Sequence, residues 1–346
     1  MKKSLTIIYM MLCLGLGARC QDTLSVAFVG DVMMHAKQLE YNYTSFFNKA
    51  EHLMKEPDIT VANMEFALGG KPYSGYPSFS APDGYALYMC EIGTDVFLTA
   101  NNHILDKGDK GLERTLGIYN RMMADSLIQY TGCAMDEASD TLLNPLIIDA
   151  KGMRIALVNF TYGTNYSSEK KWPAVKRMNK DSVKKMFDRA ADANADFVIA
   201  LPHWGEEYSL THSSSQKEWA KWMVDQGASL IVGAHPHVVQ DTTHISGTPV
   251  IYSLGNAVSN MSAVNTRLEL MVVARFLKDE EGRTSMLEPE LKFLWCSLPG
   301  HFNDTYTVLP VEEMIDRRDL WKNPADYDNM ISTLKRVTKT TGIQSK

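Results

Sequence analysis

Short apolar runs alternate with amphipathic stretches along most of this chain of 346 residues. The apolar runs, which are typical of buried strands, cover residues 24–30, 58–63, 95–100, 196–201, 229–233 and 249–253. Apolar residues spaced three or four positions apart predict helices over residues 43–55, 110–125, 181–193 and 214–226. Because strands that alternate with helices pack in layers around one core, this pattern predicts an α/β sandwich.

Two further pairs of strands are predicted to run antiparallel. Residues 142–149 and 154–159 flank a short turn that contains Gly152, and residues 267–277 and 287–295 are expected to close the fold. These pairs predict mixed rather than purely parallel sheets. The charged segment 311–346 is expected to form a peripheral helix and a frayed tail, which leaves residues 22–310 as the folded domain.

The first 20 residues have the pattern of a secretory signal peptide. Lys2 and Lys3 precede an apolar run over residues 5–16, which is too short to span a membrane comfortably. Cleavage after Cys20 would release a periplasmic or secreted protein, and we favour this over a lipid anchor on Cys20 because Arg19 fits a lipobox poorly. The remaining sequence contains no run of 18 apolar residues, so we expect no transmembrane span in the mature chain.

Charge and cysteine content exclude some classes of function. The formal net charge is −6, whereas nucleic-acid binding usually needs a basic face, so no nucleic-acid partner is expected. Cys90, Cys133 and Cys296 are dispersed and form no CxxC pair, which argues against a thiolate zinc site. A disulfide between two of them and three separate thiols both remain open.

Polar side chains that can bind metal ions follow the predicted strands at the point where each strand ends. These residues are Asp31, Asn63, Glu65, Asn101, Asn102, His103, His203, His235, His237 and Asn256. Open α/β sheets place their sites beyond the carboxyl ends of their strands, so we expect these side chains to converge. Each residue alone is an ordinary turn or core residue, but burying all of them together without a function costs desolvation. Carboxylate, amide and imidazole groups are suited to zinc, manganese or iron.

The motifs around these residues carry a resemblance to a known family. They are Gly30-Asp31, Asn63-Met-Glu65, residues 100–108, His203-Trp-Gly205, residues 233–237 and residues 253–256. In this order they resemble the poly-γ-glutamate capsule-synthesis (CapA-like) family over residues 24–260. That family is similar in fold to the calcineurin-like metallophosphoesterases, and the resemblance therefore implies a sandwich of two mixed β-sheets flanked by helices.

The resemblance also implies a site for one or two divalent ions of manganese, zinc or iron. The expected ligands are Asp31 and His237 for the first ion, Asn102, His203 and His235 for the second, and Glu65 as a bridge between them. His103 would be the catalytic histidine that protonates the leaving group or steadies the scissile group. Asp106 would orient His103, although capping of the following helix is an equally good interpretation.

One position departs from the pattern of the wider superfamily, whose first motif is Asp-x-His. Here Met33 occupies the third position of that motif, and a thioether is a poor ligand for a hard divalent ion. The first ion would therefore have one ligand fewer, unless His35 compensates from two residues further on. This departure leaves a site with a single ion open.

Three other features allow two interpretations each. Trp204 would line the pocket or belong to the core. The aromatic segment around Tyr73 and Tyr76 would form a substrate rim or a packed surface loop. The lysines and arginines between Lys170 and Lys185 would bind an acidic polymer or form a solvated helix face, which is the more common arrangement.

These observations predict an exported, metal-dependent hydrolase that acts in the biosynthesis or processing of a capsule or envelope polymer similar to poly-γ-glutamate. Its substrate would be an extracytoplasmic polymer or a phosphoester. The alternative is a non-catalytic metal-binding scaffold or polymer-binding accessory protein. Either protein would work beside envelope-associated capsule machinery. Fold analogy alone does not fix the substrate.

Overall fold

The computed structural model describes residues 22–343, and their strands form two mixed sheets and one small ribbon. The first sheet has the order β17 (Thr307–Pro310), β16 (Glu290–Ser297), β14 (Leu268–Lys278), β1 (Asp22–Val32), β2 (Ile59–Met64), β3 (Val96–Leu98) and β4 (Gln129–Thr131). In addition, β13 (Asn256–Val258) pairs with β1, and β15 (Thr284–Met286) pairs with β14. Strands β1 to β4 run parallel, whereas β14, β16 and β17 are antiparallel.

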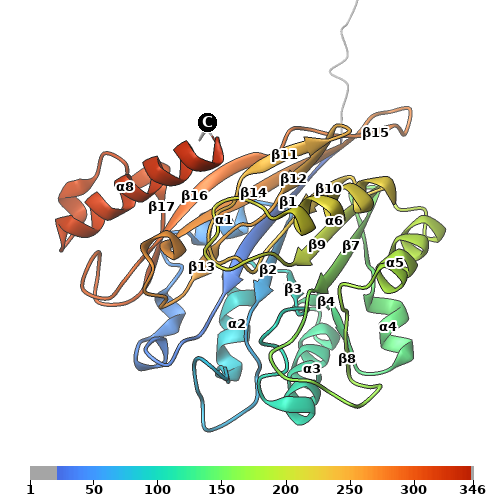
Figure 1. Cartoon of the computed structure of the whole chain (residues 1–346), viewed down its shortest axis with the longest axis horizontal. Coiled ribbons are helices and arrows are strands. Elements are labelled where there is room, and N and C mark those ends of the chain that lie inside the picture. Colours follow the sequence, from blue (N-terminus) through green and yellow to red (C-terminus); the bar gives the residue numbers. More distant parts are fainter. Residues whose placement is uncertain (1–21, 344–346) are drawn as a thin grey trace, which may run out of the picture.

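The second sheet is also mixed. Its order is β11 (Thr242–Ile245), β12 (Thr248–Ile251), β10 (Leu230–Val232), β9 (Phe197–His203), β7 (Met153–Thr161) and β6 (Leu146–Ala150), with β6 and β11 as antiparallel edges. The ribbon pairs β5 (Cys133–Ala134) with β8 (Ala174–Val175). The two large sheets pack face to face, since Phe197 of β9 and Phe276 of β14 lie with ring centroids 4.6 Å apart. The expected sandwich of two mixed sheets is confirmed (Figure 1).

Helices cover the outer faces of this sandwich (Figure 1). They are α1 (Glu51–Lys55), α2 (Asp83–Glu91), α3 (Gly108–Ala124), α4 (Glu137–Leu143), α5 (Lys180–Asp192), α6 (Ser214–Asp225), α7 (Val311–Met314) and α8 (Pro324–Thr341). On α3, Tyr119 packs against Phe97 of β3 with ring centroids 5.3 Å apart. On the second sheet, Phe187 of α5 and Met223 of α6 belong to one buried apolar cluster with Val158 of β7. The helices predicted over residues 110–125 and 181–193 thus bury the apolar faces that the spacing indicated.

Two predicted elements are wrong in part. The helix expected over residues 43–55 is reduced to α1, with a 3-10 turn at Tyr43–Ser45 before it. The strand expected over residues 142–149 starts only at Leu146, because α4 continues to Leu143. A capping box, in which Asp136 and Ser139 satisfy each other's backbone N–H groups, begins this helix and sets the chain in helical conformation.

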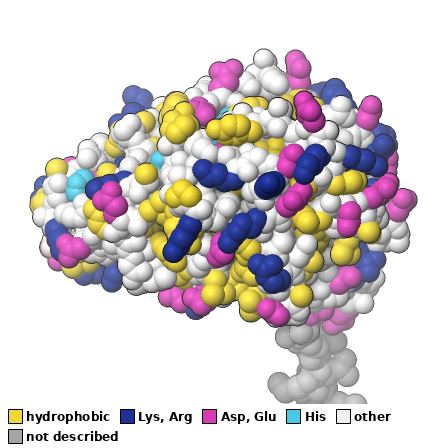
Figure 2. Space-filling view, turned by 90° about the horizontal axis from the view of Figure 1, so that it is seen from below, with side chains coloured by type: hydrophobic (Ala, Val, Ile, Leu, Met, Phe, Trp, Pro, Cys, Tyr) yellow, Lys and Arg dark blue, Asp and Glu magenta, His cyan; other side chains and the backbone are white. Residues whose placement is uncertain are grey.

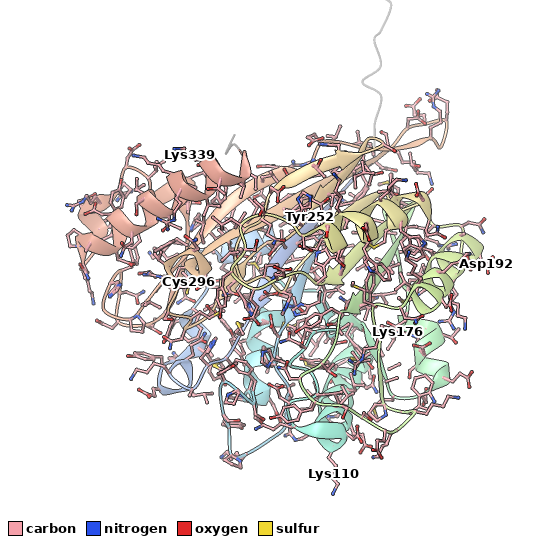
Figure 3. The ribbon with its side chains drawn as sticks, viewed as in Figure 1. Lys110, Lys176, Asp192, Tyr252, Cys296 and Lys339 are labelled. Carbon is pink, nitrogen blue, oxygen red and sulfur yellow. The ribbon has the colours of Figure 1, made fainter. Side chains whose placement is uncertain are left out.

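The C-terminal segment packs on the first sheet through α8, which is joined to the strands by buried charges. Arg267 lies 2.6 Å from Asp326 of α8, and Ser297 donates a hydrogen bond of 2.9 Å to the same carboxylate. Figure 3 shows Lys339 pointing away from α8 into solvent, whereas Cys296 lies inside the fold. None of the helices in residues 22–343 is long and apolar enough to cross a membrane. The expected signal peptide, residues 1–20, lies outside the described residues, as does the end of the expected tail.

Candidate metal centre

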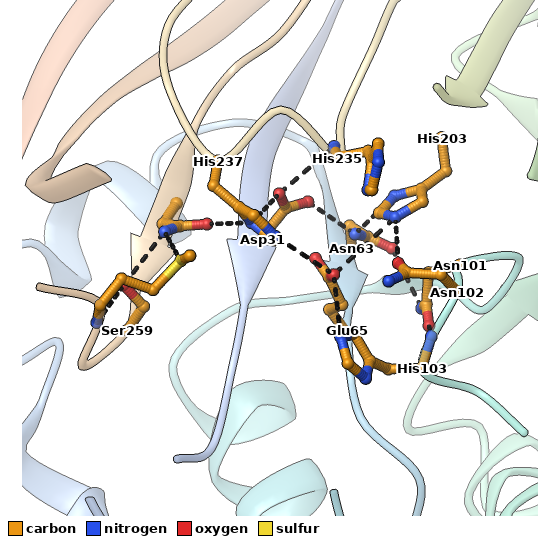
Figure 4. A network of polar contacts seen from close by, with 12 residues as sticks. Asp31, Asn63, Glu65, Asn101, Asn102, His103, His203, His235, His237 and Ser259 are labelled. Atoms are coloured by element: carbon orange, nitrogen blue, oxygen red, sulfur yellow. Dashed lines mark hydrogen bonds and ion pairs between the residues drawn. The ribbon is translucent and has the colours of Figure 1, made fainter. Parts of the chain in front are cut away.

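The polar strand ends meet at one edge of the sandwich. Parallel pairing places Asp31, near the end of β1, opposite Asn63 of β2 on one side and Asn256 of β13 on the other. From the second sheet, β9 ends at His203, whose backbone bridges Ala234 directly before the loop that carries the other two histidines. Side chains that are far apart in the sequence therefore form one network of polar contacts (Figure 4).

Asp31 is fully buried and is held from three sides. Its Oδ1 accepts a hydrogen bond of 2.7 Å from the Asn63 amide, and its Oδ2 accepts one of 3.3 Å from the backbone N–H of His235. His237 Nδ1 lies 3.3 Å from the same Oδ2. Burial raises the pKa of Asp31, but the hydrogen bond and positive charge of His237 outweigh it and lower this pKa to about 2. Asp31 is therefore a carboxylate at neutral pH.

Glu65, directly after β2, is fully buried and lies at the centre of the network. Neither of its carboxylate oxygens has a hydrogen-bond partner among residues 22–343. The Nε2 atoms of His103, His203 and His237 surround its Oε1 at 4.0, 3.8 and 3.9 Å. Burial, together with the negative charge of Asp31, raises the pKa of Glu65 well above its usual value. A buried carboxylate without partners is costly, so this arrangement fits a cation between Glu65 and the histidines.

The potential ligand atoms fall into three overlapping groups. Within each group the atoms lie within 4.8 Å of one another, and the groups are Asp31–Glu65–His237, Glu65–His203–His235 and Glu207–His235–His237. In addition, the Asn102 Oδ1 lies 2.7 Å from Nε2 of His203, at the second group. The six expected ligands are thus all brought together, and Glu65 is common to the first two groups, as a bridging carboxylate would be.

The histidines of the second group are suited to metal binding because burial keeps them neutral. Burial lowers the pKa of His203 well below its usual value and lowers that of His235 to about 3. Nδ1 of His235 has no hydrogen-bond partner among the described side chains and backbone groups. His237 is oriented through Nδ1, which lies 2.9 Å from the amide oxygen of Asn256.

The backbone of the site is strained in a way that fixes these rings. His235 and His237 both have positive φ angles, 101° and 59°, which side-chain-bearing residues adopt rarely. Gly30 must lack a side chain, because a Cβ there would lie 2.1 Å from the carbonyl oxygen of Gly255. This close approach brings β13, and with it Asn256, against β1.

His103 and Asp106 form a pair beside the ligand groups. Nδ1 of His103 lies 2.7 Å from Oδ2 of Asp106, which also accepts a hydrogen bond of 2.8 Å from the backbone N–H of Phe79. The amide of Asn165 lies 3.1 Å from the same ring nitrogen. Helix α3 has Lys107 at its N-cap, without a side-chain capping hydrogen bond. The carboxylate of Asp106 therefore contacts the histidine instead of capping the helix.

A cavity of about 370 Å³ opens next to the network. Its lining includes Met33, His35, Tyr76, His103, Glu207 and Tyr208. His35 belongs to none of the ligand groups, and its Nδ1 accepts a hydrogen bond of 3.2 Å from the backbone N–H of Asn260. His35 therefore lines the cavity without belonging to the ligand groups.

Three exposed tyrosines surround the mouth of the site. Tyr76, Tyr162 and Tyr208 are each about half exposed or more, and they come from three separate loops. The ring centroid of Tyr76 lies 6.4 Å from that of His103. The ring centroids of Tyr162 and His235 lie 4.5 Å apart, and those of Tyr208 and His237 lie 6.5 Å apart. Exposed aromatic rings gathered at a site are typical of binding surfaces. The interpretation of Tyr76 as a rim residue agrees with this placement.

Trp204, the basic residues between Lys170 and Lys185 and the three cysteines have structural rather than site positions. Trp204 is fully buried and donates a hydrogen bond of 2.9 Å to the carbonyl of Tyr252, so it belongs to the core. Several of the basic residues are paired with acids: Lys170 with Glu113, Lys176 with Asp140 and Lys184 with Asp188. Figure 2 likewise shows lysines and arginines interspersed with acidic side chains on the face that it presents. Cys90, Cys133 and Cys296 are free thiols.

Comparison with known proteins agrees with this geometry. Residues 25–261 match the family model of the bacterial capsule synthesis protein PGA_cap. The chain belongs to this family. The capsule biosynthesis protein CapA of Bacillus anthracis is 31% identical over 269 residues, which are 73% of this chain and 64% of that protein. The PGA biosynthesis protein CapA of Bacillus subtilis is 28% identical over 277 residues, 76% of this chain and 70% of that protein. The chain thus spans less than two thirds of the Bacillus anthracis relative.

A solved structure shows the fold of this PGA_cap family chain. It is a candidate 5′-nucleotidase from Staphylococcus aureus, in complex with α-ketoglutarate, and it aligns with a TM-score of 0.50 and 12% sequence identity. The match covers 90% of this chain and 58% of that chain. The fold is therefore that of the calcineurin-like metallophosphoesterases, as the motifs implied.

Asn165, Tyr162 and Glu207 were not expected in the PGA_cap site from the sequence, and Asn63 was expected at the strand ends without an assigned role. Asn63 follows its strand as the expected ligands do, and its place beside Asp31 follows from strand register. Asn165, Tyr162 and Glu207 lie on loops after β7 and β9, where no periodicity marks them. The one signal for Glu207 is its position four residues after His203.

Proposed function

We propose that this PGA_cap protein is an exported, metal-dependent hydrolase of the metallophosphoesterase type that acts on a capsule or envelope polymer similar to poly-γ-glutamate. The observation that carries the proposal is Glu65, a buried carboxylate without a hydrogen-bond partner among residues 22–343, which three imidazoles surround at 3.8–4.0 Å. Without a cation this carboxyl would either be protonated or carry a buried charge at a cost in free energy, whereas a bound cation would compensate the charged form.

The donor atoms favour divalent manganese, zinc or iron. The ligand groups contain carboxylate, amide and imidazole groups without thiolates, which suits these ions. Asp31, Glu65 and His237 would hold one ion, and Glu65, Asn102, His203 and His235 the other. A bound ion would supply Lewis-acid chemistry, because it polarises an ester oxygen and lowers the pKa of water toward about 7.

His103 would handle the proton of the leaving group. Its Nδ1 lies beside the carboxylate of Asp106, so the Nδ1–H tautomer is favoured, and Nε2 is left facing Glu65 and the ligand groups. A protonated Nε2 there can donate to a departing oxygen or nitrogen, and Asp106 stabilises the positive ring that this requires.

The substrate would be an extracytoplasmic polymer or a phosphoester. No lysine or arginine lines the described cavity, so an anionic group would be held chiefly by the ions. The tyrosines at the mouth would contact the rest of the substrate. Export rests on the signal sequence over residues 1–20, with a lipid anchor at Cys20 as the alternative, and it would place the protein beside envelope-associated capsule machinery.

The test is to measure metal content and activity on the same protein. The chain is loaded with manganese or zinc, freed of excess ion and assayed on phosphoesters and on γ-glutamyl substrates. We expect at least about one ion per chain and turnover on one of these classes that a chelator abolishes. Less than one ion per chain after loading contradicts the proposal.

One observation favours a second candidate, a metal-binding scaffold without catalysis. Met33 stands where the superfamily has a histidine ligand, and His35 belongs to none of the ligand groups. A first position with one ligand fewer would bind an ion that stabilises the fold without supporting hydrolysis. A loaded protein that is inert on all substrates, yet binds the polymer in a metal-dependent way, would support this candidate.

A further inference from the structure

An exposed carboxylate, Glu207, faces the ligand groups from the cavity. One of its oxygens lies within 4.8 Å of ligand nitrogens of both His235 and His237. Glu65 contacts the same imidazoles from the fully buried interior, whereas Glu207 lines the cavity and is open to solvent. The two glutamates thus approach the histidine pair from different sides, and only Glu65 belongs to the expected ligand set.

The backbone holds Glu207 at this place. The chain turns directly after His203, through Gly205 with a φ of 98° and Tyr208 with a φ of 66°. The backbone N–H of Tyr208 then donates a hydrogen bond of 2.9 Å to the carbonyl of Pro236, the residue between the two histidines. This hydrogen bond joins the turn that carries Glu207 to the loop that carries the imidazoles. The side chain of Glu207 is therefore kept close to the site.

Glu207 has no cationic side chain to neutralise it in the part of the chain that the structure describes. It forms no ion pair with lysine or arginine among residues 22–343, and no such residue lines its cavity. The imidazoles of His235 and His237 lie beside it, and the imidazole of His237 already lies beside Asp31 and Glu65. A carboxylate in this setting fits a cation that the histidines share.

The first metal position is the one that lacks a ligand. It has Asp31, Glu65 and His237, and the thioether of Met33 stands where a further imidazole would be. Met33 and Glu207 line the same cavity. We propose that Glu207 is a metal ligand that completes this position from the cavity side and compensates for the absence of a histidine at Met33. The inference rests on the proposed metal-dependent function.

The proposal makes the two positions chemically different. With Glu207, the first position has three carboxylates and one imidazole, whereas the second has two imidazoles, an amide and the shared carboxylate. Oxygen-rich sites favour hard ions such as manganese, and imidazole-rich sites favour zinc or iron. The first position is therefore expected to bind a hard divalent cation.

The experiment titrates the full-length metal-free protein with Mn²⁺ and counts bound ions by the electron paramagnetic resonance signal of free Mn²⁺. We expect Glu207→Gln to weaken one class of sites by about tenfold or more, since even groups that only orient ligands change metal affinity by about 10–100-fold. Glu206→Gln is the matched control, because Glu206 is exposed and adjacent but belongs to no ligand group. Equal affinities and counts for wild type and Glu207→Gln overturn the proposal.

A second variant tests compensation directly. Adding Met33→His to Glu207→Gln supplies the imidazole that the superfamily has, and we expect it to recover most of the lost affinity. Failure to recover it contradicts the claim that Glu207 stands in for this ligand. Glu65→Gln separates the two hypotheses: if wild type binds ions that depend on Glu65 but not on Glu207, only this inference fails. If wild type binds no ion, the proposed function fails as well.

Discussion

His103 lies between two carboxylates, with Nδ1 2.7 Å from Asp106 and Nε2 4.0 Å from Glu65. The short contact fixes the ring, and the long one leaves room for a substrate atom or an ion between the ring and Glu65. Both carboxylates are buried, so the ring is positioned without help from solvent. Under the proposed function, His103 would move protons while the other residues bind metal, and this separation of roles can be tested.

Substitution of His103 by glutamine is expected to remove turnover while it spares the metal. General acid catalysis contributes about 10²–10⁴-fold, so kcat should fall by this factor. Metal content, measured by elemental analysis of the loaded protein, should equal that of wild type. An equal loss of metal would show that His103 is a ligand.

Asp106→Asn tests whether Asp106 supports the role of His103 in turnover. It keeps the size of the side chain but removes the charge that stabilises a protonated ring. We expect a smaller loss of kcat than in His103→Gln, with unchanged metal content. A kcat equal to that of wild type would contradict the role of Asp106.

The stability of the metal-free protein should depend on pH through Glu65. Burial raises the pKa of this carboxyl above its unfolded value of 4.5, so its stabilising contribution is complete below pH 4.5 and is lost as pH rises through the folded value. Chelator-treated protein should therefore lose stability as pH rises above 4.5, as measured by thermal unfolding. In Glu65→Gln this dependence should be reduced. An undiminished dependence in the variant would assign it to other groups.

The tyrosine rim predicts an effect on binding rather than on chemistry. Tyr76 is 72% exposed and lies over His103, so Tyr76→Ala should change little in the fold. The loss of one aromatic contact, worth roughly 1 kcal/mol, should raise KM about fivefold at unchanged kcat. Tyr73→Ala is the control, because Tyr73 is in the same loop but does not line the cavity. Equal KM values for both variants would exclude Tyr76 from the substrate site.

The buried pair of Arg267 and Asp326 predicts that α8 contributes to stability but not to the site. Asp326→Asn removes one partner of a buried ion pair and should cost about 3–5 kcal/mol of unfolding free energy. Asp328→Asn, which breaks an exposed pair with Arg318, should cost less than about 1 kcal/mol. Urea unfolding measures both. Costs of similar size would contradict the role given to burial.

Much of the site could be predicted from the sequence because it depends on strand ends. The apolar periodicity located β1, β2, β9 and β10, and parallel strands place their carboxyl ends at one edge of a sheet. Asp31 and His203 lie at the carboxyl ends of such strands, and Glu65 follows one directly. Their convergence therefore needed only the pattern and the fold class, and the resemblance supplied the expected roles.

What could not be predicted depends on contacts between loops. Glu207 reaches the site because Tyr208 is hydrogen-bonded to Pro236, a contact between segments that no local pattern reveals. Asn165 reaches His103 in the same way, from the loop after β7. Trp204 shows the opposite case: it follows a ligand directly, yet its ring points into the core, where Tyr252 accepts its hydrogen bond.

The most direct test of the central claim is anomalous X-ray scattering from a crystal of the manganese-loaded protein. We predict at least one anomalous peak at coordination distance, about 2.0–2.3 Å, from a carboxylate oxygen of Glu65 and from at least one of His203, His235 and His237. The same peak should be absent from crystals of Glu65→Gln grown and loaded identically. A loaded wild-type crystal without a peak beside Glu65, or with peaks only at surface carboxylates, would contradict the account.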